Sequence, residues 1–169
     1  MSLTMSQMTT PALVRGLRIL SELLIKGETW AQTNGVDPSE LTTARLFEDM
    51  ASLTGQVQRI SDTAKFAIAR LSGVDSPSMA DEEQTFTHLH DRIAKTIAYI
   101  ESVPASKIDG SESRTVQLKF PHGELSTTGR AYLTGFALPN FYFHLTTAYD
   151  ILRHKGVPVG KRDFLGAWM

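Results

Sequence analysis

The stretch DPSELTTARLFEDMASLTGQVQRISDTAKFAIARLSG, residues 37–73, decides the fold. Asp37, Pro38 and Glu40 predict a helix N-terminus, because a capping carboxylate, a first-turn proline and an early glutamate all stabilise that end. Apolar residues follow at heptad-like spacings, which is typical of one buried helix face: Leu46, Met50, Leu53, Val57, Ile60, Ala64, Ala67 and Leu71. Gly73 is a typical helix end. The pattern predicts one helix of about 50 Å, long enough to cross a whole domain.

Three further helices are expected around this one. The first covers residues 6–26, where Leu13, Leu17, Leu20 and Leu24 form one apolar stripe. After a loop over residues 72–80, the third begins at a capping box of Asp81 and Gln84 and ends before Pro104. The fourth covers residues 130–154 and either kinks at Pro139 or restarts there.

A β-hairpin is expected between the third and fourth helices. Residues 115–120 alternate polar and apolar side chains, residues 121–123 predict a turn, and residues 124–128 predict the returning strand. An isolated hairpin is marginal in water, so the face of Val116, Leu118 and Phe120 is expected to lie on the bundle. The sequence therefore predicts an all-α domain, residues 1–169, built as a four-helix bundle with a small hairpin.

Composition excludes several function classes. The chain has 169 residues, with 17 Lys and Arg against 18 Asp and Glu, so no basic footprint for nucleic acid or an anionic membrane is expected. It has no cysteine, which excludes thiolate nucleophiles and cysteine-based metal sites. No apolar run is long enough to cross a bilayer and the N-terminus does not resemble a signal peptide, so we expect a cytoplasmic protein. No dinucleotide fingerprint, nucleophile elbow or zinc-protease motif is present.

One polar cluster stands out. His144 lies on the stripe of the fourth helix expected to face the core, with Asn140 one turn before it, and Asp49 and Gln56 on the second helix could face them. A core imidazole needs partners for both nitrogens. Two interpretations stay open: a structural network that fixes helix register, or a pocket for a small molecule or metal.

Two other groups invite structural explanations. Asp62 and Lys65 are expected to form a surface ion pair on an exposed flank of the second helix. Phe141, Tyr142 and Phe143 point to three sides of a helix, so core or interface packing is expected. The tail from Phe164 to Trp168 is expected to fold back on the bundle or to serve an interface.

Two motifs resemble an uncharacterised bacterial family, a domain of unknown function in the DinB/YfiT-like superfamily. They are LPNFYFHLTTAYDILRHKGVPVGKRDFLG at residues 138–166 and QVQRISDTAK at residues 56–65, within a resemblance that covers Met5 to Gly166. It implies helices in up-down-down-up order and a homodimer. It also implies a nickel or zinc site of three histidines, with a thiol-dependent transferase activity in some members.

The implied metal ligands carry over only in part. His144 matches one histidine, Asn140 takes the place of another, and Asp49 or Gln56 falls where the second helix would supply the third. Nickel and zinc favour imidazole, so Asp49, Asn140 and His144 would form a degenerate site better suited to manganese or magnesium.

Two hypotheses follow. In the first, Asp49, Gln56, Asn140 and His144 line a small-molecule pocket, His144 acts as acid–base or ligand residue, and a cofactor supplies any thiol. In the second, the chain is a non-enzymatic homodimer whose polar cluster is structural. His144→Ala should lower stability by about 1 to 3 kcal/mol in the structural case, and should be neutral or stabilising at a strained site.

Overall fold

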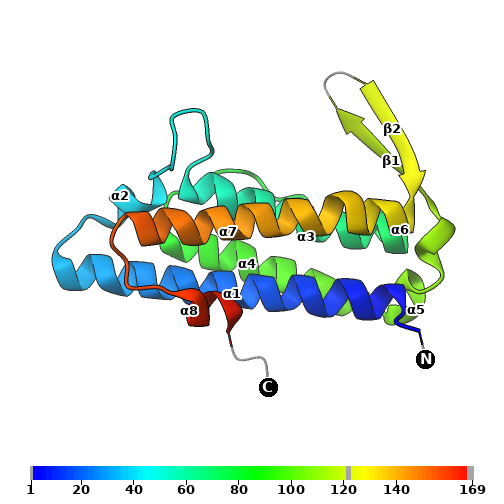
Figure 1. Ribbon diagram of the computed structural model, residues 1–169, viewed down its shortest axis with the longest axis horizontal. Coiled ribbons are helices and arrows are strands. Elements are labelled where there is room, and N and C mark those ends of the chain that lie inside the picture. The colour runs from blue at the N-terminus through cyan, green and yellow to red at the C-terminus, as the bar shows by residue number, and fades with distance from the viewer. Residues whose placement is uncertain (1, 121–122, 167–169) are drawn as a thin grey trace.

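The computed structural model describes residues 2–120 and 123–166, and it is mostly helical with one two-stranded antiparallel sheet. Four long helices lie together along one axis (Figure 1): α1 (Met5–Asn34), α3 (Leu53–Ser72), α4 (Phe86–Ser102) and α7 (Leu138–His154). α3 packs against α4 and α7, and α1 packs against the same two helices. Within the described residues no helix is both long and apolar enough to span a membrane.

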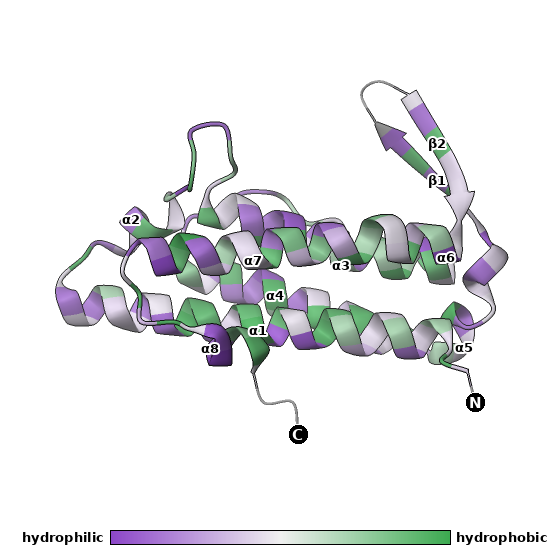
Figure 2. Cartoon of the chain, in the orientation of Figure 1, coloured by the Kyte–Doolittle hydropathy of each residue, from purple (hydrophilic) through white to green (hydrophobic). Residues whose placement is uncertain are grey.

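The leucine stripe of α1 is confirmed as core, since Leu13, Leu17, Leu20 and Leu24 are fully buried. Hydrophobic and hydrophilic residues alternate in bands along each long helix (Figure 2), as expected for helices with one buried face. α1 runs further than residues 6–26 and ends at Gly35, whose φ of 66° favours glycine.

The prediction of one continuous helix over residues 38–71 is wrong. This stretch is divided into α2 (Pro38–Thr42) and α3, with an irregular loop over residues 43–52 between them. The loop is closed by backbone, since the Leu53 amide donates a 2.8 Å hydrogen bond to the Ala44 carbonyl. Ser52 then caps α3 by accepting a bond from the Gly55 amide. Leu46 consequently belongs to an exposed loop rather than to the core stripe.

The third helix also begins later than expected. Residues 73–85 are irregular, and Thr85 rather than Asp81 caps α4 by accepting a 3.2 Å bond from the His88 amide. Val103 and the short helix α5 (Ala105–Ile108) follow, so the predicted end before Pro104 is confirmed.

The hairpin is confirmed. After a short turn, η1 (Ser111–Ser113), strand β1 (Thr115–Phe120) pairs with β2 (Gly123–Thr128), with Leu118 opposite Leu125. Figure 1 shows it leaning away from one end of the bundle. Val116 and Leu118 are nonetheless buried, as expected, whereas the turn residues Pro121 and His122 and the side chain of Phe120 lie outside what the structure describes.

The interruption predicted at Pro139 takes the form of a π-helical turn within a continuous helical backbone, since Tyr132, Leu133, Ala137 and Leu138 all have right-handed helical φ and ψ. α6 (Gly129–Tyr132) leads into η2 (Leu133–Ala137), a π-helical turn, and α7 follows with Pro139 in its first turn. Proline has no N–H to donate to the preceding turn, so a wider turn here loses little. The C-terminal helix α8 (Lys161–Leu165) packs on α1, and Lys26 forms a 2.6 Å ion pair with Asp163.

Candidate functional site

A pocket of about 290 Å³ lies between α3 and the segment η2–α7, beside β1. Two matched stripes form its walls. On α3, Arg59, Thr63, Phe66 and Arg70 recur at spacings of three and four, and on the other side Tyr132, Phe136, Asn140 and His144 recur every four residues. Asp62 and the strand residues Leu118 and Lys119 complete the lining. The pocket is thus a groove along two helices.

His144 is joined to the opposite helix by one hydrogen bond. Its Nδ1 lies 2.7 Å from Oε1 of Gln56, whose Nε2 donates to the Ala51 carbonyl at 3.0 Å. The second bond fixes the amide orientation, so Oε1 must accept and Nδ1 must carry the proton. Nε2 therefore holds an unprotonated lone pair, and no described residue bonds to it.

The half-buried position of His144 also fixes its charge. Burial, together with the positive charge of Arg59, lowers the pKa of the imidazole from 6.5 to about 4. The ring is neutral at physiological pH. His144 can accept a hydrogen bond through Nε2 there, but it is a weak general base.

Asn140 is held in the same way one turn earlier. Its Nδ2 donates a 2.7 Å hydrogen bond to Oγ1 of Thr63 across the groove, and its carbonyl oxygen stays available. The π-helical turn η2 lies immediately before this turn of α7, and such turns are frequent at functional sites. This wider turn sets the direction in which Tyr132 and Phe136 leave the helix axis, relative to Asn140.

Cations dominate the charge of the groove. Arg59 and Arg70 have no carboxylate within 4 Å among the described residues, whereas Lys119 lies 3.5 Å from Glu124 in an exposed pair. The Arg70 guanidinium donates to the Tyr132 hydroxyl at 2.9 Å and lies over the rings of Phe66 and Tyr132. These contacts hold Arg70 in one orientation.

Two of the four predicted pocket residues, Asn140 and His144, line the groove. Gln56 does not line it, but its side chain bonds to His144 between α3 and α7. Asp49 was expected on the same helix as Gln56, but it is exposed in the loop before α3 and does not line the groove. The displacement follows from the break of the predicted long helix.

The sequence and the fold both match known proteins. The model of a domain of unknown function, DUF1993, matches residues 5–165. The chain belongs to the DUF1993 family. A crystal structure described as a DinB family member from Shewanella denitrificans has 38% sequence identity and a TM-score of 0.87, and the alignment covers 96% of this chain and 92% of that one. No curated protein matches.

The groove of this DUF1993 chain does not fit the divalent metal that the family resemblance implies. Gln56 Oε1 is occupied by His144, and Asp62 is shared by two cations. The described residues contain no group of three or more His, Asp or Glu side chains that could hold a metal ion. Arg59 and Arg70 would also repel a cation. A lone imidazole and an amide oxygen are too few ligands for nickel or zinc.

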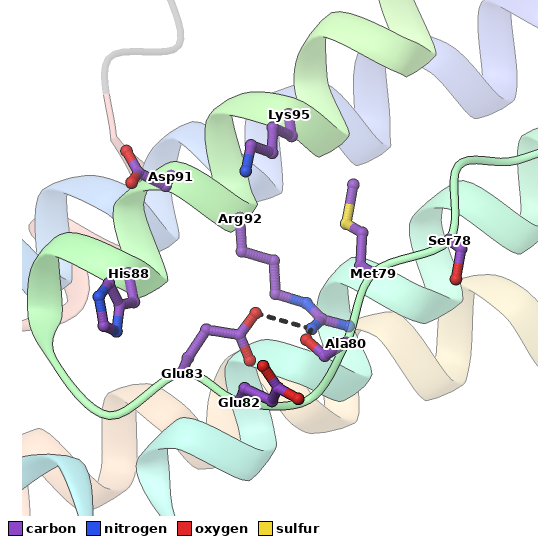
Figure 3. A pocket seen from close by; sticks show the side chains of 9 residues that line it. All are labelled: Ser78, Met79, Ala80, Glu82, Glu83, His88, Asp91, Arg92 and Lys95. Atoms are coloured by element: carbon purple, nitrogen blue, oxygen red, sulfur yellow. Dashed lines mark hydrogen bonds and ion pairs between the residues drawn. The ribbon is translucent and has the colours of Figure 1, made fainter.

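Asp62 and Lys65 do not form the exposed surface pair that was expected. Lys65 is buried and lies 2.9 Å from Asp62, and Asp62 also accepts a 2.8 Å bond from Arg92 of α4. Arg92 is 2% exposed and also binds Glu83 and Asp81 on the connection before α4. Figure 3 shows this side chain reaching from α4 toward Glu83 and Ala80. The cluster joins α3, α4 and the connection between them.

The aromatic run separates in three directions, as expected. Phe141 is in the core, Tyr142 is partly buried, and Phe143 is 58% exposed beside the His144 ring. Phe164 of the tail packs edge-on against Tyr149, whereas Trp168 lies outside the described residues.

Several residues of the groove were missed by the sequence analysis. They are Arg59, Thr63, Phe66 and Arg70 of α3 and Tyr132 and Phe136 before α7. Their regular spacing was a usable signal, because it places each set on one side of a helix.

Proposed function

We propose that this protein binds a small organic molecule in the groove between α3 and η2–α7, and that it does so without a divalent metal. One observation carries the proposal: the neutral His144 ring lines a pocket with Nε2 unprotonated and without a bonding partner among the described residues. A polar atom left open at a pocket wall is a natural ligand contact. Asn140 adds a carbonyl oxygen one turn away.

The proposal includes the arrangement of the bundle. We propose that α1, α3, α4 and α7 follow the up-down-down-up order, which agrees with the course of the ribbon in Figure 1. In that order α3 and α7 are neighbours, and the groove is formed by neighbouring helices.

The test compares metals with organic molecules on wild type and His144→Asn. The amide nitrogen of an asparagine can replace Nδ1 as donor to Gln56, so this variant removes Nε2 alone. We expect nickel, zinc and manganese to give no thermal shift that depends on His144. A panel of small acids, amines and neutral polar molecules, followed by amide NMR, should give at least one ligand that moves resonances of α3 and α7. At a hundredfold excess over its Kd, that ligand should stabilise wild type by about 2.7 kcal/mol.

Two results would contradict the proposal. A nickel or zinc shift in wild type that is lost in His144→Asn would indicate a metal site. A panel without a ligand at the groove would favour the structural alternative.

A second candidate is a non-enzymatic homodimer. The observation that favours it is the exposed Phe143 beside the groove, since large exposed aromatic side chains are enriched at interfaces. Sedimentation of wild type and Phe143→Ser tests it. A dimer that dissociates in the variant supports this candidate, and a monomeric wild type excludes it.

A further inference from the structure

The groove has an electrostatic preference for an anion. Its lining contains the cations Arg59, Arg70 and Lys119 and one carboxylate, Asp62. Asp62 is held by ion pairs at 2.9 Å to Lys65 and at 2.8 Å to Arg92, and it is outnumbered by the three cations of the lining. The lining of the groove therefore carries net positive charge, which raises the local concentration of anions.

Among the cations that line the groove, Arg70 is the one whose side chain is preorganised to bind an anion. Its guanidinium carbon lies 5.3 Å from the ring centroid of Phe66 and 5.4 Å from that of Tyr132, and one N–H donates to the Tyr132 hydroxyl. A guanidinium has five N–H groups, so donors remain for two oxygens of a carboxylate. Because the side chain is already held, little entropy is lost on binding.

The middle of the groove is apolar and aromatic. Phe66 and Phe136 line it from opposite walls, and Leu118 of β1 adds an aliphatic surface. The volume of about 290 Å³ equals roughly ten water molecules at about 30 Å³ each. This space suits one aromatic ring with short substituents.

The far end of the groove offers an acceptor. There Nε2 of His144 holds a lone pair, because Nδ1 donates to Gln56. The guanidinium of Arg70 reaches back over Phe66, and the charge of Arg59 acts on the His144 ring, so these two residues mark the ends of the span. Phe66 and Arg59 are seven residues apart, or about 10 Å along α3, and the hydrogen bond from Asn140 to Thr63 crosses the groove between them. A para-substituted ring with a short acid has about this length with one hydrogen bond at each end, and it would lie over the Asn140–Thr63 bond.

We propose that the ligand is a single-ring aromatic acid whose carboxylate binds Arg70, whose ring lies between Phe66 and Phe136, and whose distal hydroxyl donates to Nε2 of His144. The inference rests on the proposed function and names the chemical class of its ligand. Arg59 and Lys119 contribute positive potential without a direct bond to the acid. No metal takes part in recognition.

Three matched compounds test both ends of the ligand. Titration calorimetry would compare 4-hydroxyphenylacetate with phenylacetate, which lacks the hydroxyl, and with 4-hydroxyphenylacetamide, which lacks the charge. We expect wild type to bind the hydroxy acid about tenfold or more tightly than either analogue, because each analogue loses one directed contact. In Arg70→Gln the preference for acid over amide should disappear, and in His144→Asn the preference for hydroxyl should disappear.

Arg153→Gln is the control for charge alone. Arg153 is an exposed cation of α7 that does not line the groove, so both preferences should remain. Arg70→Gln keeps a donor for the Tyr132 hydroxyl, so this variant is expected to fold. The comparison of the three compounds on wild type does not depend on any variant.

The outcomes separate this inference from the proposed function. If the amide binds as tightly as the acid, or if Arg70→Gln keeps the preference for the acid, the ligand class is wrong while the groove remains a binding site. If none of the three compounds binds but another class from the wider panel does, the inference again fails alone. If nothing binds at the groove, both fail.

Discussion

Nδ1 of His144 in α7 donates a 2.7 Å hydrogen bond to Oε1 of Gln56 in α3, and this bond joins the two helices at one end of the groove. Gln56 is only 2% exposed, and its amide nitrogen is already committed to the Ala51 carbonyl. Among the described residues, the His144 imidazole is therefore the hydrogen-bond donor on which Oε1 of Gln56 relies.

His144→Ala should destabilise the protein by about 1 to 3 kcal/mol, because it leaves Gln56 Oε1 buried without a donor. His144→Asn should cost clearly less, since its amide can keep the bond. Urea denaturation of both variants measures the difference. Equal losses would mean that the bond to Gln56 contributes little, and a neutral His144→Ala would indicate strain at the site.

Stability should depend on pH through His144. Its folded pKa of about 4 lies below the unfolded value of 6.5, so between these values the unfolded chain binds more protons. Stability therefore rises with pH through this window and is lost as pH falls from about 6.5 to about 4. Wild type should lose more Tm than His144→Asn over the same interval. Carboxylates titrate in both proteins, so parallel curves would contradict the low pKa.

Arg92→Met should destabilise the protein by about 3 kcal/mol, because it removes the buried cation that Asp62 and Glu83 share. Arg18→Met is the matched control, since Arg18 pairs with Glu101 at the surface and should cost less than about 1 kcal/mol. Denaturant midpoints measure both variants. Similar losses would show that the Arg92 cluster stabilises no more than a surface pair does.

Gly16→Ala should destabilise the protein by about 1 to 3 kcal/mol through overpacking. A methyl group on Gly16 of α1 would meet the ring of Phe141 in α7, so the two helices approach closely here. Gly135→Ala is the control, because a methyl group there meets nothing within 4 Å and alanine favours helical backbone. Thermal unfolding distinguishes them. A neutral Gly16→Ala would mean that α1 and α7 can move apart at little cost.

Much of the fold could be predicted because its signals are local. The leucine stripe of α1, the helix end at Gly73 and the alternation of β1 each depend on a few neighbouring residues. The break after α2 could not be predicted in this way. Leu46 and Met50 fit the helical spacing, but the bond from the Leu53 amide to the Ala44 carbonyl and the cap at Ser52 favour a loop.

In the candidate site, too, the features set by local spacing could be predicted and those set by distant contacts could not. The face of α7 that carries Asn140 and His144 was visible from spacing, and Gln56 was a reasonable partner for it. The place of Asp49 depended on an unbroken helix and was wrong. Asp62 pairs with both Lys65 and Arg92, and Arg92 is distant in sequence, so spacing on one helix could not reveal this cluster.

The π-helical turn at Leu133–Ala137 has a consequence for length variation in this chain. Such a turn contains one residue more than an α-helical path over the same rise. Deleting one residue there would therefore let an α-helical path cover the same rise, so that Tyr132 could keep Arg70 and His144 could keep Gln56. A deletion within α7 has no extra residue to absorb it and would rotate Tyr132 by about 100° relative to His144. The wide turn is thus a place in this wall of the groove where a change in chain length can be absorbed.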